Sequence, residues 1–188
     1  MSTTTRARLT RMAAAEPIEI RRLEGPEARS RIDDLAAVLV DCVAGGASVG
    51  YMAPFSHADA LGAFEAFVAD VEQGRRVLLV AFDGDELVGT TQLVLAVPAN
   101  QPHRGEIARM LVHRRARRRG IARRLLERAE AEARAEGRTL LVLDAVTGGD
   151  AARLYDRMGW TTVGVIPNYA LYPDGRPCDT TVFYKELS

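Results

Sequence analysis

The segment from Thr139 to Leu143 limits the possible folds of this chain more than any other feature. It is a nearly continuous apolar run of five residues, which is typical of a strand covered on both faces. A helical pattern with one apolar face precedes it over Ile121–Glu136 and stops at Gly137, and a shorter helix is predicted over Asp150–Met158. A sheet with helices packed on it is therefore expected.

The remaining periodicities add strands and helices to this centre. A helix is predicted from Ala28 to the glycines at 45 and 46, and a second helix is expected to begin after Ser56, a good N-cap. Strands are predicted at Pro17–Leu23, Arg76–Phe82, Leu87–Val97, Gly105–Val112, Thr161–Val165 and Asp179–Lys185. The turn at 83–85 joins two of them, and a loop is expected over Pro167–Pro177. This order predicts a mixed sheet with helices on both faces.

Composition limits the possible partners. The chain has 188 residues, a formal net charge of 0 and a pI of about 6.8, so no overall charge favours nucleic acid or an anionic membrane. No apolar run approaches the roughly 18 residues that span a bilayer. Cys42 and Cys178 are far apart, which indicates free thiols, and a cytoplasmic protein is expected. Residues 1–15 are expected to form a flexible tail, an organellar presequence being the alternative.

An arginine run follows the strand that ends Met110-Leu111-Val112, and it continues into the helix as Arg117-Arg118-Arg119-Gly120-Ile121-Ala122. A helix start leaves about four N–H groups unpaired, with the positive end of the helix dipole behind them. Gly120 allows close backbone approach, so the turn is expected to bind phosphate. The alternatives are a solvated basic turn or a nucleic-acid patch, although no aromatic residue interleaves the arginines.

The spacing Arg117-x-x-Gly120-x-Ala122 resembles the acetyl-CoA motif of the GNAT (Gcn5-related) N-acetyltransferase superfamily. A second motif of that superfamily is matched further along the chain, by Ala151, Leu154, Tyr155, Gly159 and Trp160. The segments 45–52, 143–144 and 173–176 are closest to the tabtoxin-resistance acetyltransferase type.

The resemblance implies a single α/β (α+β) domain over residues 16–188, with a mixed, mostly antiparallel sheet of six to seven strands and about four helices. It also implies acetyl-CoA as the acyl donor and no metal. Cofactor contacts are expected from the strand end, the turn and the following helices: Met110, Leu111, Val112, Arg117, Arg118, Arg119, Gly120, Ile121, Ala122, Ala151 and Tyr155.

The chemistry needs a base, because a lysine-like amine is mostly protonated at neutral pH and must lose a proton before it attacks a thioester. Glu106 and Asp144 are the candidates, the second placed at the C-terminal end of its strand. The resemblance implies that Tyr155 protonates the departing thiolate. The alternatives are a solvent-facing Glu106, a capping Asp144 and a core Tyr155. The histidines at 57, 103 and 113 form no metal set.

We therefore expect direct acetyl transfer from acetyl-CoA to a primary amine of a small molecule that resembles an amino acid, an antibiotic or a toxin. Acetylation of a protein N-terminus or lysine, and a non-catalytic acyl-CoA sensor, are the alternatives. The acceptor pocket is expected between segments 45–52 and 168–176, and a homodimer is possible; no nucleic-acid or membrane partner is expected.

Overall fold

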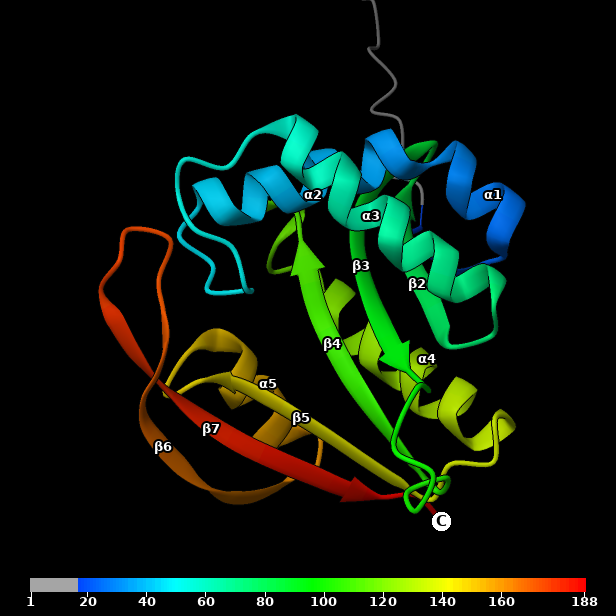
Figure 1. The fold of residues 1–188 in the computed structure, drawn as a ribbon, viewed down its shortest axis with the longest axis vertical. Coiled ribbons are helices and arrows are strands. Elements are labelled where there is room, and N and C mark those ends of the chain that lie inside the picture. The colour runs from blue at the N-terminus through cyan, green and yellow to red at the C-terminus, as the bar shows by residue number, and fades with distance from the viewer. Residues whose placement is uncertain (1–16) are drawn as a thin grey trace, which may run out of the picture.

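A computed structural model describes residues 17–188, so the expected tail at 1–15 lies outside the described residues. The chain forms one seven-stranded sheet with the order β1-β2-β3-β4-β5-β7-β6 (Figure 1). The strands are β1 (Glu19–Leu23), β2 (Arg76–Asp83), β3 (Glu86–Val94), β4 (Arg104–Val112), β5 (Leu140–Val146), β6 (Thr161–Leu171) and β7 (Pro177–Glu186). The helices are α1 (Gly25–Ser30), α2 (Ile32–Ala44), α3 (His57–Glu72), α4 (Ile121–Ala135) and α5 (Asp150–Arg157).

The pairing of β4 with β5 differs from every other pairing in the sheet. It is parallel, because α4 carries the chain from one strand to the next, whereas the other neighbours are antiparallel. It also covers only Arg104–Glu106 against Leu140–Val142. Beyond Glu106 the two strands diverge (Figure 1). The expected mixed, mostly antiparallel sheet is confirmed, with this divergence at its centre.

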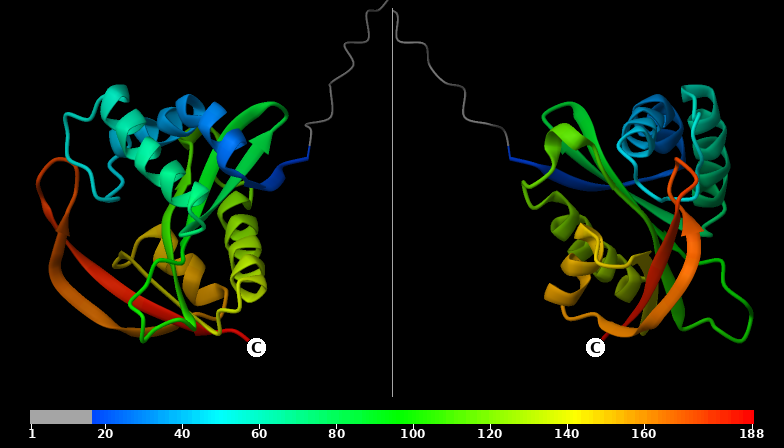
Figure 2. Two further views of the ribbon diagram at one scale, coloured as in Figure 1. Left: turned by 45° about the vertical axis from the view of Figure 1, so that its right-hand side comes forward. Right: turned by 90° about the vertical axis from the view of Figure 1, so that its left-hand side faces the viewer.

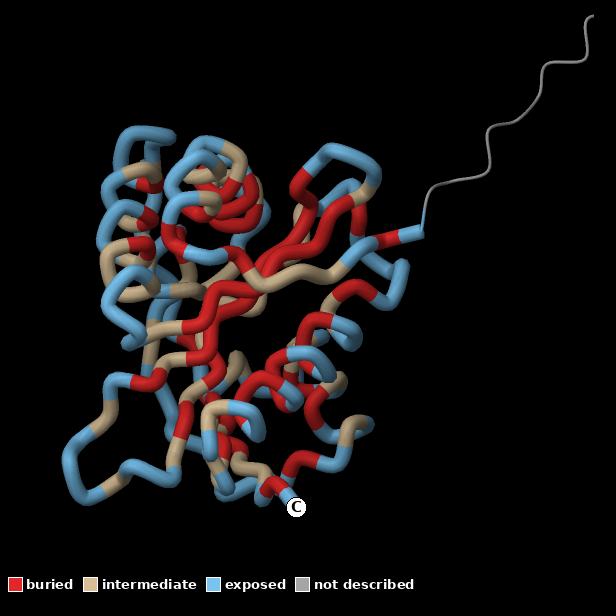
Figure 3. The backbone as a smooth tube through the Cα atoms, turned by 90° about the vertical axis from the view of Figure 1, so that its right-hand side faces the viewer, coloured by how far each residue is buried: buried red, intermediate tan, exposed pale blue. Residues whose placement is uncertain are grey.

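Helices cover both faces of the sheet, as predicted: α4 and α5 pack on one face, and α1, α2 and α3 on the other (Figure 2). Strand β2 shows why, because successive side chains of a strand point to opposite faces. Val77, Leu79 and Ala81 are buried in the cluster around α4, while Leu78 and Val80 are buried in the cluster around α2 and α3. The strands between the helix layers therefore form the buried centre of the molecule (Figure 3).

A buried polar network ties α4 to the last strands. The Glu130 carboxylate accepts hydrogen bonds from Trp160 Nε1 at 3.0 Å and from Lys185 Nζ at 2.8 Å. Lys185 Nζ also donates to the carbonyl oxygen of Met158 at 2.9 Å. Because Glu130 is only 7% exposed, its charge is stabilised by these donors rather than by water.

One prediction about the helices is wrong in detail. The helix expected from Ala28 is two helices, since Arg31, with φ −108° and ψ 9°, interrupts the helical backbone between α1 and α2. The structure consequently has five α-helices, in agreement with the expectation of about four. No helix among residues 17–188 is long and apolar enough to cross a bilayer.

Two strand boundaries are also wrong. Much of the loop expected over Pro167–Pro177 is a hairpin, because β6 runs to Leu171 and β7 starts at Pro177. A register shift between Ile166 and Ala170 accommodates Pro167 and a left-handed Asn168, with φ 51°. In addition, β5 extends to Val146 through pairing with β7, so Asp144 lies inside the strand and not at its end.

Candidate active site

The turn before α4 presents a row of unpaired N–H groups. Strand β4 ends in a short 3₁₀ turn at Arg114–Ala116, after which Arg118 and Gly120 take left-handed conformations, with φ 63° and 75°. Among residues 17–188 the backbone N–H groups of 118–123 have no hydrogen-bond acceptor, and the first helical bond runs from Arg124 to the carbonyl of Gly120 at 3.1 Å. Ile121 and Ala122 supply N–H groups of this first turn, so the turn is suited to bind a phosphate.

The arginines beside the turn fall into two groups, which the sequence does not distinguish. Three are paired with carboxylates: Arg114 with Asp41, Arg115 with Glu86 and Arg119 with Asp83. Arg117 and Arg118 are exposed and form no ion pair with any described residue; Arg117 Nε instead donates to the carbonyl of Val112 at 3.1 Å. Of the three arginines expected to attract the phosphate, Arg117 and Arg118 therefore have a charge that no described residue neutralises, whereas the charge of Arg119 is paired with Asp83.

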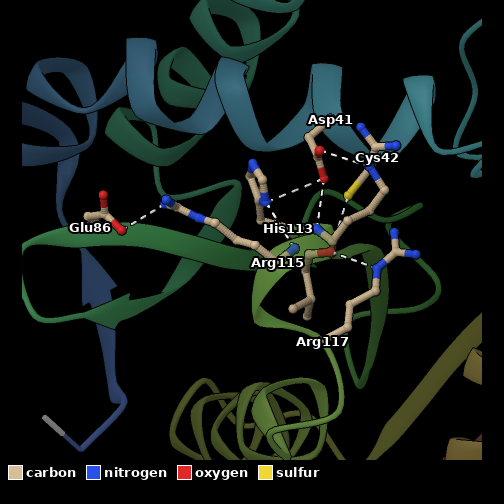
Figure 4. Close-up of polar contacts among 8 residues, drawn as sticks. Asp41, Cys42, Glu86, His113, Arg115 and Arg117 are labelled. Atoms are coloured by element: carbon tan, nitrogen blue, oxygen red, sulfur yellow. Dashed lines mark hydrogen bonds and ion pairs between the residues drawn. The ribbon is translucent and has the colours of Figure 1, made fainter. Parts of the chain in front are cut away.

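Asp41 of α2 anchors the start of the arginine run (Figure 4). Its carboxylate accepts from the backbone N–H of Arg114 at 2.8 Å and from Arg114 Nε at 2.9 Å, and it lies 3.6 Å from His113 Nδ1. Partial burial opposes its ionisation, but the hydrogen bonds from Arg114 outweigh this and lower the pKa of Asp41. Asp41 thus fixes the turn to the opposite helix layer.

Strand β4 contains a bulge before it reaches the turn. Thr90 pairs with Leu111 and Gln92 with Ala108, so two residues of β4, Arg109 and Met110, stand opposite Thr91. The residue at the bulge, Arg109, has φ 49°, an unusual value for a residue with a side chain. After the bulge Leu111 is buried against α2 and α3, while Met110 and Val112 pack toward α4.

The two candidate bases share one face of the sheet. Glu106 pairs with Val142 in the parallel ladder, and Asp144 lies two residues beyond Val142, so Glu106 and Asp144 face the same side. Ile107 and Leu143 face the opposite side, toward α4 and α5. The structure therefore brings both carboxyl groups to the edges of the diverging strands.

Asp144 and Glu106 differ in their environments. The side chain of Asp144 is open to solvent on one side, but the surrounding protein atoms remove part of its hydration and raise its pKa. Glu106 is half-buried. It forms no ion pair with any residue in 17–188, although its charge favours the protonated form of Arg76.

Tyr155 projects from α5 into the core beside Ala151 and is 3% exposed. Its ring packs against Trp160 and Phe183, with centroid distances of 5.8 and 5.6 Å. Burial, with a smaller contribution from the negative charge of Asp144, raises the pKa of its hydroxyl. The tyrosine is thus both a core residue and a protonated hydroxyl within electrostatic range of Asp144.

The two segments expected around the acceptor contact each other. Ser48 Oγ donates to the carbonyl of Leu171 at 2.8 Å, and the N–H of Ala53 donates to the carbonyl of Pro173 at 2.9 Å. A cavity of about 260 Å³ lies between them, lined by Val43, Ala44, Gly46, Ala53, Tyr172, Pro173, Asp174 and Arg176. The loop after α2 and the β6–β7 hairpin thus contact each other and line a common cavity, as the expected acceptor pocket requires.

Several residues near the site were not predicted from the sequence. Arg109 could have been singled out from the sequence, because it is a charged residue within the otherwise apolar end of β4. Asp41, Glu86 and Asp83 carried no signal, since their arginine partners lie far away in the sequence. Within residues 17–188 no group of three or more His, Cys, Asp or Glu side chains is placed to hold a metal ion.

Comparison with known proteins identifies a family pattern and a shared fold. The family described as "Acetyltransferase (GNAT) family" matches residues 48–160. An N-acetyltransferase from Staphylococcus aureus Mu50 is 19% identical, with a TM-score of 0.76 over 92% of this chain and 100% of that one. An acetyltransferase from Salmonella typhimurium, whose structure contains acetyl-CoA, is 19% identical, with a TM-score of 0.75 over 92% and 95%. A ribosomal-protein-alanine N-acetyltransferase from Brucella melitensis is 22% identical, with a TM-score of 0.76 over 90% and 99%.

Proposed function

Because the chain belongs to the GNAT acetyltransferase family, we propose that it transfers an acetyl group from acetyl-CoA to a primary amine of a small molecule. The observation that carries the proposal is the position of the unpaired N–H groups of residues 118–123, at the start of the helix that joins the two diverging strands. This arrangement offers a phosphate site and, between β4 and β5, a ladder that ends at Glu106.

The residues of the turn fit the pyrophosphate of an acyl-CoA. A Cβ atom added at Gly120 would meet no protein atom within 4 Å, so the space above the turn is open. The N–H groups of Ile121 and Ala122 and the guanidinium groups of Arg117 and Arg118 would neutralise the phosphates. Acetyl-CoA supplies an acetyl group activated as a thioester; the neighbour from Salmonella typhimurium contains the same molecule.

Beyond the turn, the backbone of Met110, Leu111 and Val112 runs along the side of β4 that loses its partner, since the β4–β5 ladder ends at Glu106. A strand edge of this kind can hydrogen-bond the amide groups of an extended ligand. These three residues would thereby align the pantetheine arm, and Ala151 of α5 would leave room beside it.

The acid and base roles follow from the environments of the side chains. Asp144 or Glu106 accepts the proton that the ammonium group of the acceptor must lose, directly or through water. The neutral amine then forms a bond to the acetyl carbon as the carbon–sulfur bond breaks, and the positively charged nitrogen loses its extra proton to water as the amide forms, which balances the proton that Tyr155 supplies. Tyr155 donates a proton to the departing sulfur, since its raised pKa keeps the hydroxyl protonated. No covalent bond to the enzyme is required.

The small-molecule acceptor is supported by the contacts at the edge of the sheet. The bonds of Ser48 to Leu171 and of Ala53 to Pro173 hold the loop after α2 against the β6–β7 hairpin. This leaves less room for an extended polypeptide. Acetylation of a protein N-terminus is the second candidate, because the neighbour from Brucella melitensis is named for that reaction.

Two measurements test the proposal. First, thermal unfolding is followed with acetyl-CoA, CoA and ATP; stabilisation by both CoA species and not by ATP is expected. Second, release of free CoA thiol is measured with a panel of small amines and with a peptide that begins with alanine. Transfer to small amines supports the proposal. If neither acetyl-CoA nor CoA stabilises the protein, the proposed cofactor is refuted. Transfer to the peptide and to none of the small amines establishes the second candidate.

A further inference from the structure

The β4 bulge turns Arg109 toward the face of the sheet that α2 and α3 cover, which is also the face of Glu106. Ile107 faces α4, so strict alternation would direct Arg109 to the same face. The extra residue at the bulge resets this alternation, and the Arg109 guanidinium lies over aromatic rings of the other layer, 4.5 Å from the centre of Phe67 and 5.9 Å from that of Tyr51. The left-handed backbone of Arg109 is a strained conformation of the kind that is frequent at functional sites.

A second cation lies beside Arg109. The guanidinium of Arg76 is 4.8 Å from the centre of the same Phe67 ring. Burial lowers the pKa of Arg76, and the positive charge of Arg109 acts in the same direction, whereas Asp70 and Glu106 oppose the shift. Two guanidinium groups therefore lie against one ring in a partly dehydrated place, and Asp70, 3.2 Å from Arg76, balances only one of the two charges.

The hydrogen-bonding capacity of this cluster is not used up. Arg76 bonds to Asp70 and Gln92, but Arg109 is in no ion pair within residues 17–188. Three shielded donors of the cluster also have no acceptor among the described residues: Arg76 Nε, Gln92 Nε2 and Arg109 Nε. All of them are N–H groups, so the cluster has more hydrogen-bond donors than acceptors.

The cluster adjoins the candidate bases. Glu106 lies three residues before Arg109 on β4, and its side chain faces the layer of Phe67 because Ile107 faces the opposite one. Glu106 and Asp144 can hold an ammonium group, and Arg109 can bind a carboxylate in bidentate fashion. One face of the sheet thus offers complementary charge for both ends of a zwitterion.

We propose that Arg109, supported by Arg76 and the ring of Phe67, binds a carboxylate of the acceptor, so that the substrate is a primary amine of the amino-acid class. This inference rests on the proposed acetyl transfer to an amine. Arg109 determines specificity and takes no part in proton transfer.

The test compares L-amino acids with their carboxamides, which keep the amine and side chain but remove the negative charge. Acetyl transfer is measured by thiol release, and binding to the CoA complex is measured by calorimetry. We expect acids to be preferred over amides by at least about tenfold in kcat/KM. Arg109→Gln should lower kcat/KM for acids by about ten- to a hundredfold, with little effect on amides or on the Kd of acetyl-CoA. Arg109→Lys should keep part of the preference.

The matched control is Arg134→Gln, which removes an exposed arginine at the far end of α4 and should change neither ratio. Equal use and equal binding of acids and amides by the unmodified protein overturns the inference while leaving the proposed function intact. Absence of transfer to every amine removes the proposed function. In that case calorimetry still decides about Arg109: acid binding that Arg109→Gln abolishes supports the subsite, and acid binding that is absent or unchanged refutes it.

Discussion

Replacement of Gly120 by alanine separates the proposed phosphate-binding role of the turn before α4 from the stability of the fold. Gly120 precedes α4 with φ 75°, a left-handed conformation, and an added Cβ would meet no protein atom within 4 Å. The substitution therefore introduces backbone strain without a clash inside the protein. The same helix provides a control at its other end, because Gly137 has φ 70° and equally open surroundings.

The magnitudes follow from this geometry. A left-handed alanine costs about 1–2 kcal/mol relative to glycine. In a chain of this size each kcal/mol corresponds to about 2–4 °C in Tm, so both Gly120→Ala and Gly137→Ala should lower Tm by about 2–8 °C. Acetyl-CoA at about 100 times its Kd should stabilise the unmodified protein by about 2.7 kcal/mol. A tenfold loss of affinity reduces that gain to about 1.4 kcal/mol.

The assay is thermal unfolding with and without acetyl-CoA, at one ligand concentration for all three proteins. Gly137→Ala should keep the full ligand-induced rise in Tm, and Gly120→Ala should lose half of it or more. Equal rises in the two variants would show that the turn does not contact the ligand closely, and the assignment of the phosphate site to Gly120 would have to be abandoned.

Three further predictions concern buried and titrating groups. Tyr155→Phe should lower turnover much more than acetyl-CoA affinity, measured by kcat and by ligand-dependent Tm; a loss confined to affinity would contradict the proton-donor role. Glu130→Ala should cost about 2–4 kcal/mol in chemical denaturation, because it removes the acceptor of Trp160 Nε1 and the buried negative charge that faces Lys185 Nζ, and Glu130→Gln should cost less. Since burial raises the pKa of Asp144, its ionisation in the folded state reduces stability as pH rises above about 4, the ordinary aspartate pKa. Asp144→Asn should therefore raise Tm at pH 7 but not at pH 3, while lowering acetyl transfer; the same gain at both pH values would show that ionisation is not the cause.

The predictable elements of the fold were those with a local pattern. The apolar face of α4, the run at 139–143 and the glycines after α2 and α4 depend on neighbouring residues, and the corresponding elements are found within a few residues of their predicted bounds. The β6–β7 hairpin was missed between Ile166 and Leu171, because Pro167 and Asn168 look like a loop. Pairing with β7 supplies the backbone hydrogen bonds that make this segment a strand.

In the candidate site, too, features with a local sequence pattern were predictable and features set by strand pairing were not. The geometry of the turn before α4 was predictable because Gly120 and the start of the helix are adjacent in the chain. The relation between Glu106 and Asp144 was not, since it depends on the register of β4 against β5. Arg109 was overlooked because its direction is set by a bulge opposite Thr91, and a bulge is decided by the partner strand.

The arginines show most clearly what the sequence determined and what the tertiary structure determined. The sequence by itself determined a turn with free N–H groups, a buried strand beside it and a tyrosine on the following helix, because helix starts and apolar periodicity are local properties. Only the tertiary structure decided which arginines remain available to an anion. Asp41, Glu86 and Asp83 neutralise Arg114, Arg115 and Arg119, while Arg117, Arg118 and Arg109 form no ion pair among residues 17–188. Ion pairing falls off steeply with distance, and the fold alone sets the distances between residues that are remote in the chain.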